Sequence, residues 1–258
     1  MTLPRERRAR LWVGTSGWQY DHWRGRFYPR ALARRDWFSH YAAHFETVEI
    51  NNTFYGLPGE GTFDAWRAAA PPGFLYALKF SRYATHLKHL KQPAPALRAF
   101  LTRARRLRDR LGPILVQLPP RWSPDLPRLA GFLAALPRRQ RFAVELRDPR
   151  WLTDATFALL RGHGAALCIH DALDDHPREV TADFVYLRFH GPGVRYAGSY
   201  SPQRLAAEAR RIRAWLRRGL DVHAYFNNDA GAHAVRNALA LRRTVRGAGS
   251  AGPGPGRC

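Results

Sequence analysis

The chain has 258 residues, of which 45% are hydrophobic and 24% are charged. This composition supplies one substantial core for one or two domains and excludes a wholly disordered chain. No run reaches the roughly 18 apolar residues of a membrane helix. The first ten residues, MTLPRERRAR, carry charges without the apolar region of a signal peptide. We therefore expect a cytoplasmic protein without a membrane partner.

The formal charge is +22, from 42 Lys and Arg residues against 20 Asp and Glu. A surplus of this size raises the question of nucleic-acid binding. Three of the basic residues are lysines, at positions 79, 88 and 91, and the other 39 are arginines. Such replacement of lysine by arginine is typical of a G+C-rich coding bias. We therefore favour an arginine-rich solvated surface and keep a polyanion-binding face as the alternative.

The two cysteines predict no disulfide, because Cys168 lies in an apolar run and Cys258 ends a Gly/Pro-rich segment. No zinc-type Cys/His spacing, GxGxxG or GxxxxGK[ST] motif is present in the sequence. No cofactor is therefore predicted, although a divalent metal stays open.

Short β-rich runs alternate with longer amphipathic runs in chain order. Eight runs have the composition of strands: 11–16, 47–51, 75–81, 114–119, 142–147, 166–171, 184–190 and 221–227. Seven runs have helical periodicity: 31–45, 61–70, 95–111, 126–136, 153–163, 202–219 and 232–243. No obvious helix follows the sixth strand.

Strict alternation of strands and helices predicts parallel strands joined by right-handed crossovers. Eight such units in about 250 residues favour a barrel over a doubly wound sheet, which usually has fewer strands. We predict an α/β protein with a single TIM-like (β/α)8 barrel over residues 11–245, irregular at the sixth helix. Residues 1–10 are predicted to be a basic extension and residues 246–258 a disordered Gly/Pro tail.

Polar residues recur at alternating positions near the ends of the predicted strands. In a barrel, one face of each strand packs against helices, so polar residues of the other parity face the interior and meet at the C-terminal mouth. These residues are Glu49, Asn51, Lys79, Ser81, Gln117, Glu145, Arg147, Arg188, His190, His223, Tyr225 and Asn227. Because unpaired buried charges are costly, the groups satisfy a ligand or one another. We favour a ligand site over internal pairs such as Glu49 with Lys79.

Two loops at the same end point to an anion. The segment THLKHLK (85–91) follows the third strand and carries His86, and HGPG (190–193) follows the seventh. Gly-rich turns after late barrel strands offer backbone N–H groups to phosphate, although a plain turn is an equal interpretation. Lys79, an interior lysine in an arginine-rich chain, suggests a deprotonatable amine of the Schiff-base type. A charge partner for Glu49 or Glu145 explains it equally well.

The same residues carry a family resemblance. The segments are GTSGWQYDHWRGRFYP (14–29), EINNTFY (49–55), KFSRYATH (79–86), QLPP (117–120), ELRDPRW (145–151), HG (190–191), YAGSY (196–200) and FNN (226–228). Through them the chain resembles the YecE-like family, domain of unknown function 72, although positions 148–150 depart from its pattern. The resemblance implies a TIM-like barrel with a polar pocket at the mouth. The implied pocket residues are Thr15, Trp18, Tyr20, Glu49, Asn51, Thr53, Tyr55, Lys79, His86, Gln117, Glu145, Arg147, Trp151, Arg188, His190, Asn227 and Asn228.

We expect an enzyme that acts on a small anionic substrate, phosphorylated or carboxylated and sugar-like. Its reaction class is open, and a hydrolase, lyase or isomerase fits best. The expected catalytic residues are Glu49, Glu145, His190 and Lys79, with one glutamate as general base, and the other pocket residues bind substrate. A divalent metal on Glu49, Glu145, Asp171 and His190 is a less favoured variant. The alternatives are a nucleic-acid-binding protein or nuclease and a non-catalytic ligand-binding barrel.

Overall fold

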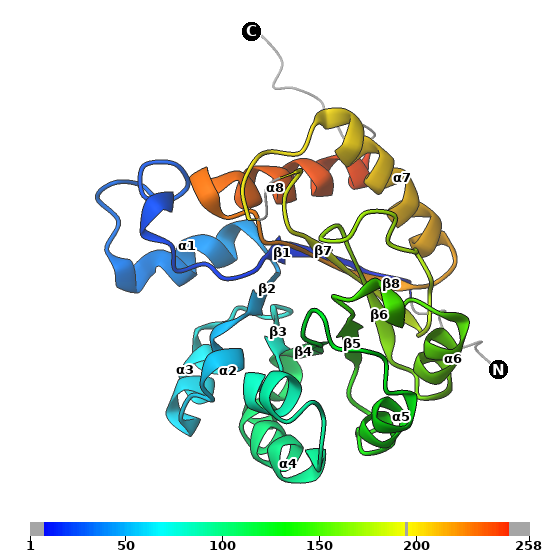
Figure 1. The fold of residues 1–258 in the computed structure, drawn as a ribbon. Helices are drawn as coiled ribbons and strands as arrows, with labels where there is room; N and C mark the ends of the chain where they lie inside the picture. Colours follow the sequence, from blue (N-terminus) through cyan, green and yellow to red (C-terminus); the bar gives the residue numbers. More distant parts are fainter. Residues whose placement is uncertain (1–7, 194–195, 248–258) are drawn as a thin grey trace, which may run out of the picture.

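The computed structural model describes residues 8–193 and 196–247. Eight strands form the sheet: β1 Leu11–Thr15, β2 Thr47–Ile50, β3 Leu75–Lys79, β4 Leu111–Gln117, β5 Phe142–Glu145, β6 Ala166–His170, β7 Phe184–Phe189 and β8 Asp221–Phe226. Their order is β1-β8-β7-β6-β5-β4-β3-β2, every pair is parallel, and the helices surround the strands (Figure 1). This arrangement confirms the predicted TIM-like (β/α)8 fold and all eight strands.

Seven α-helices of the described residues follow the predicted runs: α1 Trp37–His44, α3 Glu60–Ala69, α4 Pro93–Ala104, α5 Leu126–Ala134, α6 Asp154–Gly162, α7 Pro202–Arg217 and α8 His233–Arg246. A further short helix is α2 Asn52–Tyr55. Shorter turns are η1 Asp21–Trp23, η2 Arg34–Asp36, η3 Tyr83–Leu87, η4 Arg105–Arg110, η5 Pro149–Trp151 and η6 Ala230–Ala232. The four-residue α2 was not predicted. Residues 171–183, between β6 and β7, contain no helix, which agrees with the predicted irregularity at the sixth position.

Local sequence explains where several helices begin. The Ser201 hydroxyl accepts a hydrogen bond from the Arg204 backbone N–H at 3.2 Å, and Pro202 opens α7. The Asp125 carboxylate accepts from the Arg128 N–H at 3.0 Å and caps α5 in the same way. Side-chain oxygens at this position satisfy N–H groups that have no partner within the helix. These caps hold the outer helices in place against the barrel.

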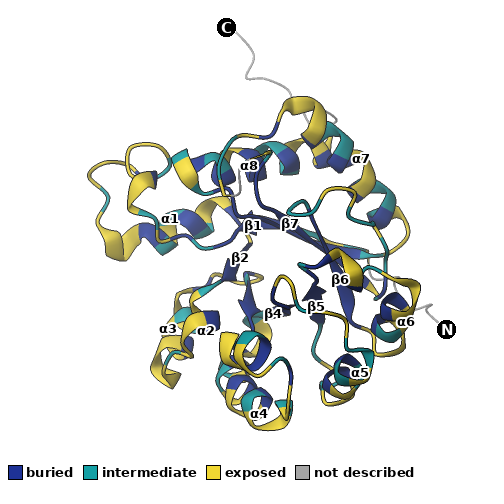
Figure 2. Ribbon diagram, in the orientation of Figure 1, coloured by how far each residue is buried: buried dark blue, intermediate teal, exposed yellow. Residues whose placement is uncertain are grey.

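Buried residues form two layers around the strands. Figure 2 shows buried strands in the centre and helices that turn exposed faces to solvent. One apolar cluster fills the space between strands and helices. A second lies inside the barrel and consists of Ala77, Leu115, Ala143, Ala166, Cys168, Phe184, Tyr186 and Tyr225. This interior plug closes the barrel below the C-terminal mouth, so polar groups at the strand ends lie on an apolar floor.

The barrel is joined differently between β1 and β2. Instead of a ladder, a single bridge pairs Ser16 with Glu49 at this seam. The Tyr41 hydroxyl from α1 accepts a hydrogen bond from the Thr15 N–H and donates one to the Thr47 carbonyl, both at 3.0 Å. A side chain from a helix therefore links backbone groups that a strand ladder would pair directly.

The ends of the described region can be compared with the predicted domain boundaries. Helix α8 ends at Arg246, one residue beyond the predicted end of the barrel. Most of the predicted extension and tail, residues 1–7 and 248–258, lies outside the described residues. Within the described part of the chain, every helix is too short or too polar to cross a membrane. The cytoplasmic location stays a prediction.

Candidate functional site

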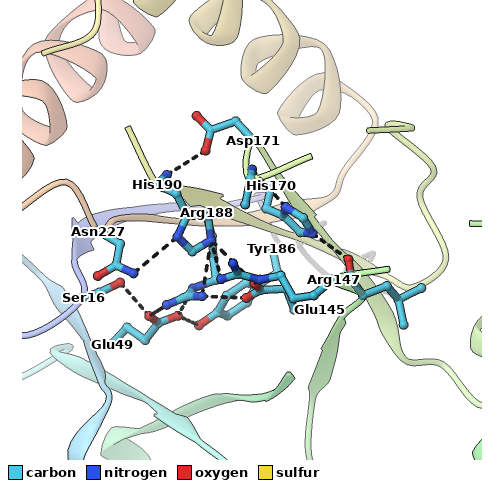
Figure 3. A network of polar contacts seen from close by, with 12 residues as sticks. Ser16, Glu49, Glu145, Arg147, His170, Asp171, Tyr186, Arg188, His190 and Asn227 are labelled. Atoms are coloured by element: carbon cyan, nitrogen blue, oxygen red, sulfur yellow. Dashed lines mark hydrogen bonds and ion pairs between the residues drawn. The ribbon is translucent and has the colours of Figure 1, made fainter. Parts of the chain in front are cut away.

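Arg188 lies at the centre of a buried ion network at the C-terminal end of the barrel interior (Figure 3). Its side chain is 1% exposed and reaches carboxylates on two other strands. Nε and Nη2 donate to Glu49 on β2 at 3.0 and 2.7 Å, and Nη1 donates to Glu145 on β5 at 2.6 Å. Burial alone would lower the pKa of Arg188, but the two carboxylates hold it well above its usual range. Arg188 is therefore a fixed cation that ties β7 to β2 and β5.

Glu49 is saturated by donors from its own surroundings. Besides Arg188, the Ser16 hydroxyl donates to Oε1 at 2.6 Å and the Tyr186 hydroxyl donates to Oε2 at 2.7 Å. The side chain has no exposed surface. Glu49 would have to give up one of these hydrogen bonds to meet a substrate. Its predicted role as general base stays a prediction.

Glu145, Arg147 and His190 form the upper part of the same network. Glu145 is fully buried and accepts a hydrogen bond from Arg147 Nε. Burial alone would raise the pKa of Glu145, but Arg147 and Arg188 hold it well below its usual range. The His190 Nε2 lies 3.1 Å from Arg147 Nη2 and 3.6 Å from Glu145 Oε1. Nε2 can accept from Arg147 or donate to Glu145, depending on the tautomer. Burial, followed by the charge of Arg188, lowers the pKa of His190 to about 3.

Four inward-facing side chains at the strand ends keep a small exposed fraction. Lys79, Gln117 and Asn227 are 8%, 9% and 9% exposed, and the side chain of Arg147 is 8% exposed. Asn227 also extends toward His190, with 3.4 Å between Nδ2 and Nδ1. The group consists of two cations and two neutral amides, with the two carboxylates covered beneath it. Such a surface suits an anion rather than a cation.

Several predicted pocket residues form hydrogen bonds with backbone groups. The Thr15 hydroxyl donates to Gly17 O at 2.6 Å, and the Thr53 hydroxyl donates to Lys79 O at 2.8 Å. Trp151 is fully buried and donates from Nε1 to Trp122 O, and Asn228 donates to Gly198 O. Tyr55 is 78% exposed on α2. The structure shows these contacts, and the pocket roles of Thr15, Thr53, Tyr55, Trp151 and Asn228 stay predictions.

Trp18, Tyr20 and Asn51 line a separate hollow of about 180 Å³. The Tyr20 hydroxyl donates to Ser16 O at 2.6 Å, and burial raises the pKa of Tyr20 above its usual range. The buried Asn51 Oδ1 has no hydrogen-bond partner among the described residues. Of the predicted substrate-binding residues, these three form their own small recess. They are not part of the ion network.

The HGPG loop is occupied by protein contacts. The His190 N–H donates to Asp171 Oδ1 at 2.7 Å, and the Gly191 N–H donates to the Tyr200 hydroxyl at 2.6 Å. Tyr200 and Arg204 donate to the other Asp171 oxygen. A cleft of about 740 Å³ lies beside this loop, lined partly by Asp171 and Arg204. Because two backbone donors are already used, the arrangement favours a structural turn over the predicted phosphate loop.

The predicted metal set does not assemble. The three metal-type side chains that the described residues bring within 4.8 Å are Glu145, His170 and His190. His170 Nε2 contacts the Leu146 carbonyl at 2.9 Å, and Nδ1 accepts from the Ala172 N–H at 3.2 Å, so both ring nitrogens are engaged. The His190 Nε2 faces a guanidinium. The arrangement does not fit a divalent ion unless these rings turn, and Glu49 and Asp171 lie outside the trio.

Sequence reasoning missed three members of the network: Ser16, His170 and Tyr186. Each lies two residues along the chain from another residue that faces the barrel interior, as Ser16 does from Gly14 and His170 from Cys168. The same alternation that identified Arg188 and His190 also covers Tyr186. The signal was present, but serine and tyrosine were not treated as partners for buried charge.

The arginine surplus is distributed over several outer helices. Exposed arginines include Arg105 and Arg108 on η4, Arg210 and Arg217 on α7, and Arg243 on α8. Helix α4, which η4 continues, and helix α8 lie on opposite sides of the barrel (Figure 1). Exposed basic residues also follow the strands at the mouth end of the barrel, among them Arg24, Arg82 and Arg121. Binding of nucleic acid therefore stays an untested alternative.

Three buried histidines predict stability that is lost in acid. Burial lowers the pKa of His170, His190 and His223 to about 4, 3 and 3, below the unfolded value of about 6.5. Between pH 6.5 and about 4 the unfolded chain therefore binds more protons. We expect the free energy of unfolding to fall on acidification by up to about 1.4 kcal/mol per pH unit for each histidine, measured by urea unfolding at pH 7, 6 and 5.

His223→Phe isolates one of these contributions. Neither ring nitrogen of His223 has a hydrogen-bond partner among the described residues, and the ring stacks on Trp12 at 4.6 Å. We expect the variant to lose the share of the pH slope that His223 contributes, up to about 1.4 kcal/mol per pH unit. Exposed His163→Gln is the control and should keep the full slope. An unchanged slope in His223→Phe would show that His223 is protonated in the folded state.

The fold and site together define a TIM-like barrel whose C-terminal mouth is polar and rests on a buried ion network. The family model described as "Protein of unknown function DUF72" matches residues 12–256. The chain therefore belongs to the DUF72 family, which confirms the resemblance seen in the sequence.

Relatives and solved structures agree with this assignment. The chain is similar to UPF0759 protein YecE of Escherichia coli K12, with 32% identity over 55% of this chain, and it spans about half of that relative's length. It is similar to UPF0759 protein YunF of Bacillus subtilis 168, with 22% identity over 88% of this chain and 92% of the relative. A DUF72 family protein (TM1631) from Thermotoga maritima has TM-score 0.82 and 28% identity, over 92% of this chain and 99% of that one. A second DUF72 structure, EF0366 from Enterococcus faecalis, has TM-score 0.78 at 19% identity, over 92% and 95% of the two chains.

Proposed function

We propose that the protein is an enzyme that acts on a small anionic substrate, phosphorylated or carboxylated and sugar-like, at the C-terminal mouth. The observation that carries this proposal is the charge balance of the site. The three cations Lys79, Arg147 and Arg188 face the two carboxylates Glu49 and Glu145. One positive charge is left over, and the cations that keep a small exposed fraction are Lys79 and Arg147. A ligand with a carboxylate or phosphate would complete the pairing.

His190 is the candidate acid–base group, although it lies beneath the mouth surface and reaches it through Arg147 and Asn227. It is neutral at pH 7, and its Nε2 lies between Arg147 and Glu145. An anion bound to Arg147 would offset the positive charge that lowers the basicity of His190. Glu145, 3.6 Å away, would stabilise the imidazolium that forms after proton uptake. This pairing assigns proton transfer to His190 with Glu145 as its partner, as expected for a hydrolase, lyase or isomerase.

Anion-induced stabilisation tests the proposal. Urea unfolding is followed with inorganic phosphate, citrate and glucose 6-phosphate at constant ionic strength. A ligand at 100 times its Kd should raise the free energy of unfolding by about 2.7 kcal/mol. Arg147→Gln should abolish this gain because it removes the accessible guanidinium.

Arg138→Gln is the matched control. Arg138 is exposed and lines a basic cleft of about 640 Å³ near the start of β5, together with Arg139, Arg141 and His163. We expect this variant to keep the full anion response. If Arg138→Gln loses the response and Arg147→Gln keeps it, the anion binds at this second cleft and the proposed site is wrong. If none of the anions stabilises the wild type, the proposal also fails.

A further inference from the structure

Lys79 is a buried cation without a charge partner. It ends β3 at the mouth, and its Nζ lies 4.1 Å from the centre of the Phe54 ring. The nearby carboxylates Glu49 and Glu145 are paired with arginines instead. Within the described part of the chain, the Lys79 amine therefore has an aromatic face but no ion pair. The alternative in which Lys79 pairs with Glu49 or Glu145 is therefore not what the described residues form.

The surroundings of Lys79 favour its neutral form. Burial makes the largest contribution, Arg188 adds to it, and together they lower the pKa of Lys79 to about 8, against the weaker opposing effect of the two glutamates. Arg147 acts in the same direction as Arg188. At pH 8 about half of the Lys79 side chains would carry a nucleophilic amine.

His86 lies beside the same aromatic ring. Its imidazole packs edge-on against Phe54, with 5.0 Å between ring centres, and its Nδ1 contacts the Thr85 hydroxyl at 2.9 Å. Burial, followed by the charge of Lys79, lowers the pKa of His86 to about 4. Lys79 and His86 therefore pack on the same aromatic ring, and the neutral imidazole is the candidate to accept a proton and return it.

We propose that Lys79 is a catalytic amine that forms an imine with an aldehyde or ketone group of a small anionic substrate. The Nζ lone pair attacks the carbonyl carbon, and the π electrons of the carbonyl move to oxygen. His86 carries one proton from nitrogen to that oxygen and gives the carbinolamine. It then carries the second proton from nitrogen to the hydroxyl, which leaves as water while the nitrogen lone pair forms the C=N bond. One amine and one carbonyl give one imine and one water, so no oxidant or reductant is needed.

This inference rests on the proposed function, because the anionic group would be held by Arg147 while the carbonyl lies over Lys79. It narrows the substrate class to carbonyl compounds that carry a carboxylate or phosphate. It also explains a feature of the sequence: arginine, which stays protonated, could replace lysine as an anion clamp but not as a nucleophile.

The chain provides its own competition experiment, since it contains three lysines. The full-length protein is incubated at pH 8 with limiting pyridoxal 5′-phosphate, an aldehyde that carries a phosphate. Borohydride then delivers hydride to the imine carbon and fixes it as a secondary amine, and peptide mass spectrometry locates the label. We expect Lys79 to be labelled at least about tenfold more than the exposed Lys88 and Lys91.

Two controls separate a reactive amine from a general preference. The selectivity should disappear in urea, where all three lysines are equivalent. Lys79→Arg keeps the positive charge and should lose the dominant label while Lys88 and Lys91 react as before. If Lys88 or Lys91 in the folded wild type is labelled as strongly as Lys79, the inference is overturned.

Failure of this inference can be distinguished from failure of the proposed function. If phosphate stabilises the wild type through Arg147 but Lys79 is not preferentially labelled, the anion site stands and the amine chemistry is wrong. If Lys79 is labelled equally by pyridoxal and its phosphate, and equally in Arg147→Gln, the reactive amine stands and the anion site is wrong.

Discussion

Replacing Arg188 with Met is expected to lower the free energy of unfolding by about 3–5 kcal/mol, the largest effect of any single change considered for this barrel. The substitution removes the guanidinium from between two carboxylates that have no exposed surface, Glu49 and Glu145. Each carboxylate would remain charged and out of contact with water but would have fewer hydrogen-bond donors, which destabilises the folded state. Urea unfolding of the wild type and the variant at pH 7 measures the loss.

Two comparisons make this result specific. Arg188→Lys should recover little of the loss, because an ammonium cannot donate to both carboxylates in the planar geometry of a guanidinium. Arg150→Ala removes a guanidinium whose side chain is 55% exposed and paired with Asp148, and it should cost less than about 1 kcal/mol. A loss in Arg188→Met as small as that in Arg150→Ala would show that water reaches the two carboxylates.

Gly14→Ala is expected to destabilise the protein by about 3 kcal/mol, because it forces β1 away from β2. A Cβ at this position would lie 2.3 Å from the Thr47 carbonyl oxygen, and the obstacle is backbone that cannot rotate away. The seam is also where the Tyr41 hydroxyl bridges Thr15 and Thr47, so the displacement would strain these hydrogen bonds too. Denaturant unfolding is the measurement.

Gly131→Ala is the matched control. Gly131 lies on the exposed side of α5, and a Cβ there has no neighbour within 4 Å. This substitution should raise stability by up to about 1 kcal/mol through helix propensity. If Gly14→Ala is as well tolerated as Gly131→Ala, β1 can shift relative to β2 and the close approach at the seam is not required.

The architecture was accessible from periodicity. Each strand is short, apolar and followed by turn residues, and alternation with helices leaves few topologies. Parity along a strand was equally informative, since it assigned Glu49, Glu145 and Arg188 to the barrel interior before any coordinate was known. Loop residues were harder. Thr53 and Trp151 belong to motifs of the family, but their hydrogen bonds go to backbone carbonyls, which sequence patterns do not identify.

The sequence by itself determined an eight-stranded barrel with a charged mouth, because strand parity depends only on local backbone geometry. Only the tertiary structure decided how those charges are shared. Arg188 reaches both glutamates from across the barrel, which covers Glu49 and leaves Lys79 without a carboxylate. Which cation pairs with which anion depends on distances between strands far apart in sequence. That is why the sequence could suggest an amine at Lys79 but could not separate it from an ion pair with a glutamate.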